Sequence, residues 1–332
     1  MTLWLQFIAC TGMILFAGTY LSKYGDIIAE KTGLGRTWIG VILMASVTSL
    51  PELMTGLSSV ALFDLPDIAV GNILGACMLN LLMIPLLDLL GGSAPLSTRV
   101  HQGHILTAGF GILMLGLVSL SMLLGPSLPS IGWIGTNSLL LIAIYFVAMR
   151  MVFIYEKRRI AQFVKEMAEE AQYRDFSKSR AYLMFGVNAV IIIAAAIYLP
   201  HLGEEIAKKT GLGQTFVGSV LIALSTTLPE LVVSISALMI GAADMAVGNL
   251  FGSTVFNLFI LALDDFFYVA GPLLTQVSNN HQVSSISAVI ALAIAVIGLI
   301  YRADKKSLFF AWDSLTILAI YGFALSFLYI MR

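Results

Sequence analysis

Residues 31–54 read KTGLGRTWIGVILMASVTSLPELM, and residues 209–232 read KTGLGQTFVGSVLIALSTTLPELV, a near-copy at a shift of 178 positions. A second pair follows in the same order, with IAVGNILGACMLN at 68–80 and MAVGNLFGSTVFN at 245–257, at a shift of 177. Chance does not plausibly give two such pairs in one order. The chain is therefore built from an internal repeat, and this repeat decides its fold.

The composition defines the class of protein. Hydrophobic types make up 59% of the 332 residues and charged types 11%, whereas a soluble domain is about 45–50% apolar and about 25% charged. So few polar groups cannot cover a surface in water, which excludes a soluble enzyme, a nucleic-acid binder and a disordered protein. The long apolar runs do not alternate, which excludes a membrane β-barrel. We expect an all-α polytopic membrane protein in contact with the lipid bilayer.

Apolar runs bounded by glycine, proline or charge predict ten transmembrane helices. The first run has no basic segment before it and indicates a membrane helix, not a cleaved signal peptide. Five helices is an odd number, so the second half enters the membrane from the opposite side and the two repeats are inverted, as in secondary transporters. The expected divisions are a first five-helix repeat at 1–154, a linker at 155–180 and a second five-helix repeat at 181–332. The expected spans are 3–21, 37–62, 67–90, 104–124, 132–154, 181–199, 214–240, 244–270, 284–301 and 308–330.

Lysine and arginine determine the expected orientation. With ten spans, 15 of the 18 basic residues fall on the side of the central linker, and basic loops face the cytoplasm. The linker is then cytoplasmic, and both termini lie outside. We expect the linker to be solvated, with an amphipathic helix on the membrane surface as the alternative. The compact chain favours a prokaryotic inner (plasma) membrane, and we expect it to function as a monomer.

Each repeat places a proline–glutamate pair inside an apolar span, Pro51-Glu52 and Pro229-Glu230. Proline frees a carbonyl four residues earlier, which needs another partner in lipid. A charged residue at bilayer depth costs at least about 2.5–3.5 kcal/mol, and no lysine or arginine lies in the four motif spans to compensate it. A bound cation or protons must balance two such charges. The purely structural alternative is two protonated glutamates that hydrogen-bond to helix carbonyls.

Neutral oxygen donors accompany the two glutamates. Asn72, Ala76 and Asn80 share one helix face because they are spaced i, i+4, i+8, and the second repeat has the same spacing. These positions and the hydroxyls before each glutamate supply hard oxygens, which suit Ca²⁺, Mg²⁺ or Na⁺ and not soft metals. Besides the glutamates, the oxygen-bearing candidates are Thr48, Ser49, Asn72, Asn80, Thr226, Thr227, Asn249, Ser253 and Asn257.

Six aspartates near the spans have lesser expected roles. Those toward span ends are expected to reach water, with lining of an ion path as the alternative; they are Asp88, Asp264 and Asp265. Those in connections near the motifs are expected as solvated helix caps, with an ion-entry role as the alternative; they are Asp64, Asp67 and Asp244.

The four histidines and two cysteines all have unremarkable expected environments. The histidines lie near predicted loops, where we expect exposure, with pH sensing as the alternative; they are His101, His104, His201 and His281. Cys10 and Cys77 lie in apolar runs and are expected to be free thiols.

The two motifs resemble those of a known family. VTSLPE with GNILGACMLN, and STTLPE with GNLFGSTVFN, look like the two α-repeats of the cation/calcium exchanger superfamily, especially its sodium/calcium exchanger branch and prokaryotic members. The resemblance implies ten helices and alternating access. It implies exchange of a divalent cation, with Ca²⁺ as the principal candidate, against Na⁺ or H⁺. It implies neither a cofactor nor an enzymatic activity.

The resemblance also implies a role for individual positions. The calcium site maps onto Glu52 and Glu230, with the main-chain oxygens of Thr48 and Thr226. The central polar pair maps onto Asn80 and Asn257, and the sodium-site positions map onto Ala45, Ser49, Ala223, Thr227 and Ser253.

Two positions depart from the family pattern. Ala76 stands where the family usually has serine, and Thr227 where serine is common, so one hydroxyl ligand is missing. The stoichiometry and the coupling ion therefore stay open. Asn257 argues against potassium coupling, which an aspartate accompanies in a sister branch. The alternatives are an H⁺-coupled exchanger, one selective for Mg²⁺ or another divalent cation, and, more remotely, a cation channel.

Overall fold

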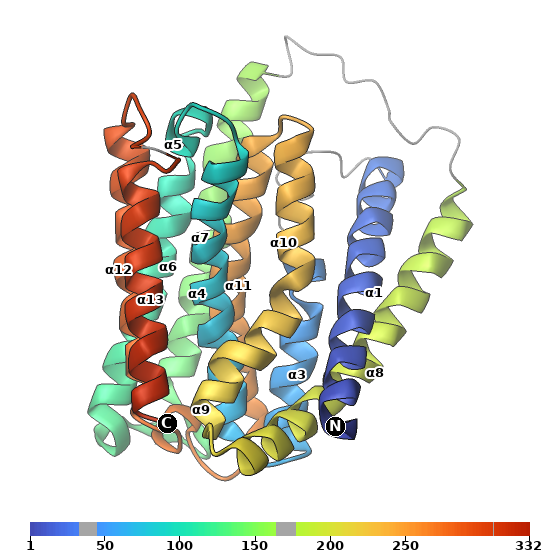
Figure 1. Cartoon of the computed structure of the whole chain (residues 1–332), viewed down its shortest axis with the longest axis vertical. Coiled ribbons are helices and arrows are strands. Elements are labelled where there is room, and N and C mark those ends of the chain that lie inside the picture. Colours follow the sequence, from blue (N-terminus) through green and yellow to red (C-terminus); the bar gives the residue numbers. More distant parts are fainter. Residues whose placement is uncertain (33–44, 164–176, 308) are drawn as a thin grey trace.

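The structure is a computed structural model that describes residues 1–32, 45–163, 177–307 and 309–332. Long helices stand side by side in one bundle (Figure 1). The first half contains α1 (Thr2–Thr32), α3 (Leu50–Ala61), α4 (Pro66–Leu90), α5 (Leu96–Arg99), α6 (His104–Leu124), a turn η1 (Gly125–Ser127), a hairpin of β1 (Ser130–Ile131) and β2 (Ile134–Gly135), and α7 (Thr136–Phe163). The second half contains α8 (Lys178–Thr210), α9 (Gln214–Phe216), a π-helical segment η2 (Val217–Ile222), α10 (Ala223–Met239), α11 (Ala243–Phe267), a turn η3 (Leu273–Thr275), α12 (His281–Tyr301) and α13 (Trp312–Ile330).

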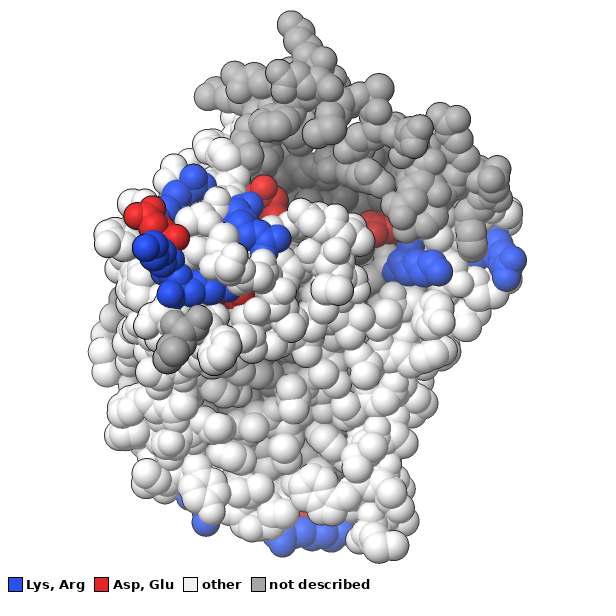
Figure 2. Space-filling model, turned by 45° about the horizontal axis from the view of Figure 1, so that its top comes forward, with Lys and Arg blue, Asp and Glu red and all other residues white. Residues whose placement is uncertain are grey.

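The described helices confirm the all-α membrane class. Within the described ranges, nine helices are long and apolar enough to cross a membrane, and they correspond to nine of the ten expected spans. The remaining expected span, 37–62, falls partly outside the described residues, and its described part holds α3. On the face shown in Figure 2, charged residues gather at the two ends and leave a broad uncharged band between them. Such a band is the surface that lipid requires.

Three helices continue past their expected spans, and one of them is α7, which runs to Phe163. α1 continues to Thr32 and α8 to Thr210, well past their apolar runs. In α8, Lys208 pairs with Glu204 at 2.7 Å and Lys209 with Glu205 at 3.4 Å, which supports the last turns beyond the membrane. The helix stops at Gly211, which takes the left-handed conformation with φ of 71°.

Contacts between helices follow a pseudo-two-fold symmetry. α1 packs on α8, α4 on α11, and α6 on α12, so these first-half helices meet their second-half counterparts. Other cross-repeat contacts come in matched pairs: α3 with α8 and α10 with α1, α4 with α10 and α11 with α3, α4 with α12 and α11 with α6, α4 with α13 and α11 with α7. The two motif helices, α4 and α11, form the centre of the bundle. In the most apolar stretch of each helix, 78% of the residues of α4 and 72% of those of α11 are buried. The fold is that of two inverted helical repeats.

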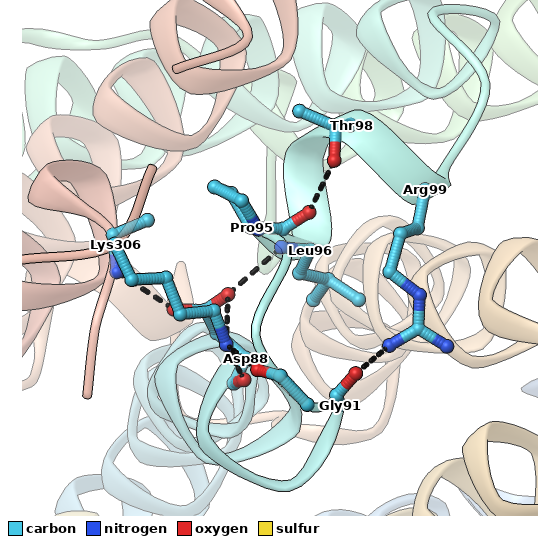
Figure 3. Close-up of polar contacts among 9 residues, drawn as sticks. Asp88, Gly91, Pro95, Leu96, Thr98, Arg99 and Lys306 are labelled. Atoms are coloured by element: carbon cyan, nitrogen blue, oxygen red, sulfur yellow. Dashed lines mark hydrogen bonds and ion pairs between the residues drawn. The ribbon is translucent and has the colours of Figure 1, made fainter. Parts of the chain in front are cut away.

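Asp88 is a structural residue and does not reach water, which corrects the sequence-based expectation. Its side chain is fully buried at the end of α4. One carboxylate oxygen accepts the Leu96 N–H at 2.8 Å, and the other accepts the Ala311 N–H at 2.8 Å. The Lys306 ammonium lies 3.1 Å away and also donates to nearby carbonyls (Figure 3). Asp88 therefore ties the end of α4 to the next loop and to the start of α13.

Asp265 does the same in the second repeat, and it too is buried rather than near water. Its carboxylate accepts the Leu273 N–H at 2.5 Å and the Gly135 N–H at 2.9 Å. Leu273 follows Asp265 by the same eight positions that separate Leu96 from Asp88, and Gly135 directly precedes α7. Each aspartate thus accepts one N–H from its own repeat and one from the opposite repeat, Ala311 for Asp88 and Gly135 for Asp265.

Two histidine–aspartate pairs join the repeats at opposite ends of the bundle. His281 Nε2 lies 2.9 Å from Asp67, and His104 Nε2 lies 3.0 Å from Asp244. In each pair the aspartate is in the first turn of a motif helix and the histidine begins a helix of the other repeat. His281 is fully buried, and His101, His104 and His201 are partly buried, so the expected exposure of the histidines was wrong. Asp64 and Asp244 are exposed, as expected.

The chain ends lie at one end of the bundle, and α5 lies at the other (Figure 1). α7 runs from the end with the termini to the opposite end, which is also where α8 starts. Residues 155–163 of the expected linker continue α7 as a helix, whereas residues 164–176 lie outside the described residues, so the conformation of that part stays a prediction. Both cysteines are free and buried, as expected.

Candidate ion-binding site

The two glutamates lie in the middle of the bundle, and proline shapes the backbone around the first. Glu52 and Glu230 are both fully buried. α3 starts at Leu50 with Pro51 in its first turn, where a missing N–H is tolerated. In the second repeat, Pro229 lies inside the continuous helix α10. The two repeats therefore carry equivalent carboxylates on different backbones: Glu52 lies in the first turn of a helix, and Glu230 lies inside a continuous helix.

Each glutamate is held by a hydroxyl of the opposite repeat. Ser49 Oγ donates to Glu230 Oε1 at 3.1 Å, and Thr227 Oγ1 donates to Glu52 Oε1 at 3.2 Å. This crossed arrangement places the carboxylates of both repeats in a single site at the pseudo-two-fold axis.

The first asparagine of the GN motif, Asn72 in the first repeat and Asn249 in the second, makes different contacts in the two repeats. Asn72 Oδ1 accepts the Thr226 hydroxyl at 2.9 Å, and Asn72 Nδ2 donates to the Glu52 carbonyl at 3.5 Å. Asn249 Nδ2 instead donates to Ser234 Oγ at 3.2 Å, on the face one turn beyond Glu230. Asn72 thus joins the hydrogen-bond network around Glu52, whereas the contacts of Asn249 are with α10.

Several buried polar atoms of the motif residues, most of them oxygens, have no hydrogen-bond partner in the described part of the chain. They include the second oxygen of each glutamate, both amide heavy atoms of Asn80 and of Asn257, and Ser253 Oγ. All five side chains are fully buried. A buried polar atom without a partner costs about 1–3 kcal/mol, so their concentration in one set of residues indicates that they have another partner. Carboxylate, amide and hydroxyl oxygens are the ligands of a hard cation.

The remaining predicted positions supply backbone and spacing. Ala45 and Ala223 are buried, and their carbonyls accept hydroxyl protons from Thr48 at 3.1 Å and from Thr227 at 2.7 Å. Ala76 is fully buried and contributes no side-chain oxygen. Among the described residues, no cluster of three or more His, Cys, Asp or Glu side chains forms a metal site. The candidate site thus has two carboxylates, and its other predicted donors are neutral oxygens.

A π-helical segment next to the site was missed by the sequence analysis. Residues 217–222 form η2, directly before the helix that carries Glu230. Gly75 of α4 lies so close that a Cβ there would collide with the Ser219 carbonyl, and a Cβ on Gly71 would lie 3.0 Å from the Ser219 nitrogen. No residue pattern in the sequence distinguishes a π turn from an α turn. Such turns are frequent at functional sites.

The inverted helical repeats and their central pair of carboxylates define the class of protein, an integral membrane transporter. The profile of the family described as sodium/calcium exchanger protein matches residues 2–154 and 180–330. The chain belongs to this family, whose members are exchangers and not enzymes.

Individual relatives agree with this assignment. The chain is 25% identical over 250 residues to the inner membrane protein YrbG of Escherichia coli (strain K12). The matched region covers 75% of this chain and 74% of YrbG. Its fold matches the solved H⁺/Ca²⁺ exchanger CAX with a TM-score of 0.72 at 12% identity, over 99% of this chain and 86% of CAX. It also matches the sodium-calcium exchanger NCX_Mj, soaked with Na⁺ and Sr²⁺, with a TM-score of 0.63 at 19% identity, over 97% of this chain and 96% of that chain.

Proposed function

We propose that this chain exchanges Ca²⁺ for Na⁺ by alternating access, at a site built on Glu52 and Glu230. The observation that carries the proposal is the crossed pair of hydrogen bonds, Ser49 to Glu230 and Thr227 to Glu52, which joins the carboxylates of both repeats at one place. The family's exchange of inorganic cations is consistent with it.

Charge balance gives the proposed mechanism. The two glutamates supply a charge of −2 with no lysine or arginine on α3, α4, α10 or α11. One Ca²⁺ balances this charge, and Na⁺ ions compete for the same oxygens. An unloaded site leaves two carboxylates uncompensated at membrane depth, which disfavours the conformational change without cargo. Mutually exclusive occupancy then couples the two fluxes.

The proposed ligands divide between the two ions. Ca²⁺ is held by the glutamates and the main-chain oxygens of Thr48 and Thr226. The central amides flank the site, and hydroxyls and main-chain oxygens of neighbouring residues hold Na⁺. In full, the proposed set is Glu52, Glu230, Thr48, Thr226, Asn80, Asn257, Asn72, Asn249, Ala45, Ser49, Ala223, Thr227 and Ser253.

The proposal extends to location and assembly. Each repeat forms one five-helix unit, 1–154 and 181–332, and a cytoplasmic linker at 155–180 joins them in a prokaryotic inner membrane. Both termini lie outside. A single chain holds both halves of the site, which supports function as a monomer.

Uptake of radiolabelled Ca²⁺ into proteoliposomes tests the function. We expect uptake when Na⁺-loaded vesicles are diluted into Na⁺-free buffer, and none without the gradient. Uptake driven only by an outward proton gradient would instead mean that the glutamates exchange protons for the metal. No uptake under either gradient, with transport of Mg²⁺ in its place, would contradict the choice of Ca²⁺. Stimulation by unlabelled Ca²⁺ on the opposite side distinguishes an exchanger from a channel, which shows none.

A further inference from the structure

Asp264 on α11 is a buried carboxyl group that the proposed exchange mechanism does not use. Its side chain is fully buried, and neither carboxylate oxygen has a hydrogen-bond partner among the described residues. The adjacent Asp265 is different, because two backbone N–H groups donate to it. The register-equivalent residue in the first repeat is Leu87, so Asp264 stands outside the two-fold symmetric site.

Asp264 lies at the contact between α3 and α11, two of the helices that carry site residues; we call this contact the α3–α11 seam. A Cβ on Gly56 of α3 would lie 2.7 Å from one of its carboxylate oxygens, so the carboxyl group rests directly on the α3 backbone. Gly56 is one turn beyond Glu52, and Asp264 is on the face of Asn257, seven residues or about 10.5 Å further along α11. The seam runs from the ion site toward the end of the bundle that holds the termini.

No base faces Asp264 from the surrounding helices. α3, α4, α6, α10 and α11 carry no lysine or arginine. Arg150 of α7 lies 14 residues from Thr136, about 20 Å away along the helix from the end that meets Asp265. The acidic neighbour is Asp265 on the same helix. The nearby phenols are Tyr268, one turn later at the end of α11, and Tyr145 of α7, which stacks on Phe259 of α11. His104 begins α6 at the opposite end.

Among the described residues, an ionised carboxylate in this position has neither a donor nor a cation to compensate the loss of water, and that loss is expensive. A bound proton removes the charge and needs no further ligand. We propose that Asp264 is a proton-binding site in the α3–α11 seam, separate from the Glu52 and Glu230 site, and that its proton exchanges with water when these helices move during transport. The step is a simple acid–base equilibrium, in which one proton binds a carboxylate oxygen and leaves to water.

Infrared spectroscopy of the purified protein tests proton binding directly. At about pH 7, an ordinary aspartate with a pKa near 3.9 is ionised, so a protonated carboxyl band comes only from unusual sites. Saturating Ca²⁺ keeps the two glutamates ionised if they bind the metal. We expect a protonated carboxyl band that shifts in D₂O, is lost in Asp264→Asn and persists in Asp304→Asn, a matched change of an exposed aspartate.

Two results would overturn the proposal. A carboxyl band that is the same in wild type and Asp264→Asn would show that Asp264 is not protonated. Equal deuterium exchange of the band with and without turnover would contradict its exchange during transport. Asp264→Leu, which copies the residue at position 87, is the second variant if the asparagine variant does not fold.

The measurement of deuterium exchange during transport rests on the proposed function. The presence of the protonated carboxyl band in the resting protein does not. A band assigned to Asp264 in a protein that transports no Ca²⁺ would therefore disprove the function and leave the proton site intact. Conversely, normal Ca²⁺ uptake without the band would disprove only the proton site.

Discussion

At the residue scale, the central feature is that each glutamate depends on both repeats. Glu52 is carried by α3 and receives its hydrogen bond from Thr227, whereas Glu230 is carried by α10 and receives its bond from Ser49. A change in either carboxylate therefore affects the whole site and not one half of it. For the same reason, we expect Glu52 and Glu230 to be equally important for transport.

Glu52→Gln and Glu230→Gln should each abolish divalent transport. Glutamine keeps an oxygen that can accept the hydroxyl proton but removes one of the two charges that balance a divalent cation. A loss of about 3 kcal/mol in ion binding corresponds to roughly a 100-fold weaker affinity. Radiolabelled Ca²⁺ uptake measures the effect. Glu204→Gln, at a partly exposed ion pair with Lys208, is the control that should transport normally, and normal transport by either site variant would refute the assigned roles.

At the element scale, α4 is fitted closely against the π-helical segment η2. Gly75→Ala should disturb this fit, because the added methyl group collides with the Ser219 backbone, which cannot move as a side chain could. Overpacking of this kind costs about 1–3 kcal/mol. We expect a lower thermal unfolding midpoint in detergent and reduced transport.

Gly116→Ala provides the matched control for that substitution. Gly116 lies inside α6, and a Cβ there meets nothing within 4 Å. Alanine is favoured over glycine inside a helix by about 0.5–1 kcal/mol, so this variant should be as stable as the wild type or more so. Equal midpoints for the two alanine variants would contradict the role given to the α4–η2 contact.

The two histidine–aspartate pairs should differ in strength although they are related by symmetry. His281 is fully buried and Asp67 is 25% exposed, whereas His104 and Asp244 are 15% and 53% exposed. Exposed pairs contribute about 0–1 kcal/mol because water screens them, so the Asp67–His281 pair should show the larger coupling energy. Double-mutant cycles with alanine, read by thermal unfolding, measure both values. A larger coupling for Asp244–His104 would show that exposure does not set the difference.

At the scale of the whole molecule, the symmetry determines which ends of the chain share a side. Both termini lie at one end of the bundle, and the α12–α13 connection lies at the other (Figure 1). A cysteine introduced at Arg332 should react with an impermeant maleimide from outside intact cells, whereas one at the exposed Lys305 should react only after permeabilisation. The native thiols are buried, so the background is low. The reverse pattern would invert the proposed orientation and leave the fold unchanged.

Much of this protein could be predicted from sequence because two strong signals are local in the chain. Apolar composition forces membrane helices, since lipid offers no hydrogen bonds to any other backbone conformation. The repeated motifs predicted the register of the two halves and the family, and they include Ser49 and Thr227, whose hydroxyls bond the two glutamates. The expectation that Asp88, Asp264 and Asp265 reach water was wrong, because all three side chains are buried.

What only the tertiary structure decided are the partners that come from the opposite repeat. The sequence does not state that Ser49 bonds Glu230, that Asp88 anchors the start of α13, or that His281 is buried against Asp67. It also does not distinguish Asp264, without a partner, from Asp265, which has two. The physical reason is the same in each case. Burial and hydrogen bonding depend on which helix faces which across the pseudo-two-fold axis, and this is a property of packing between segments far apart in the chain.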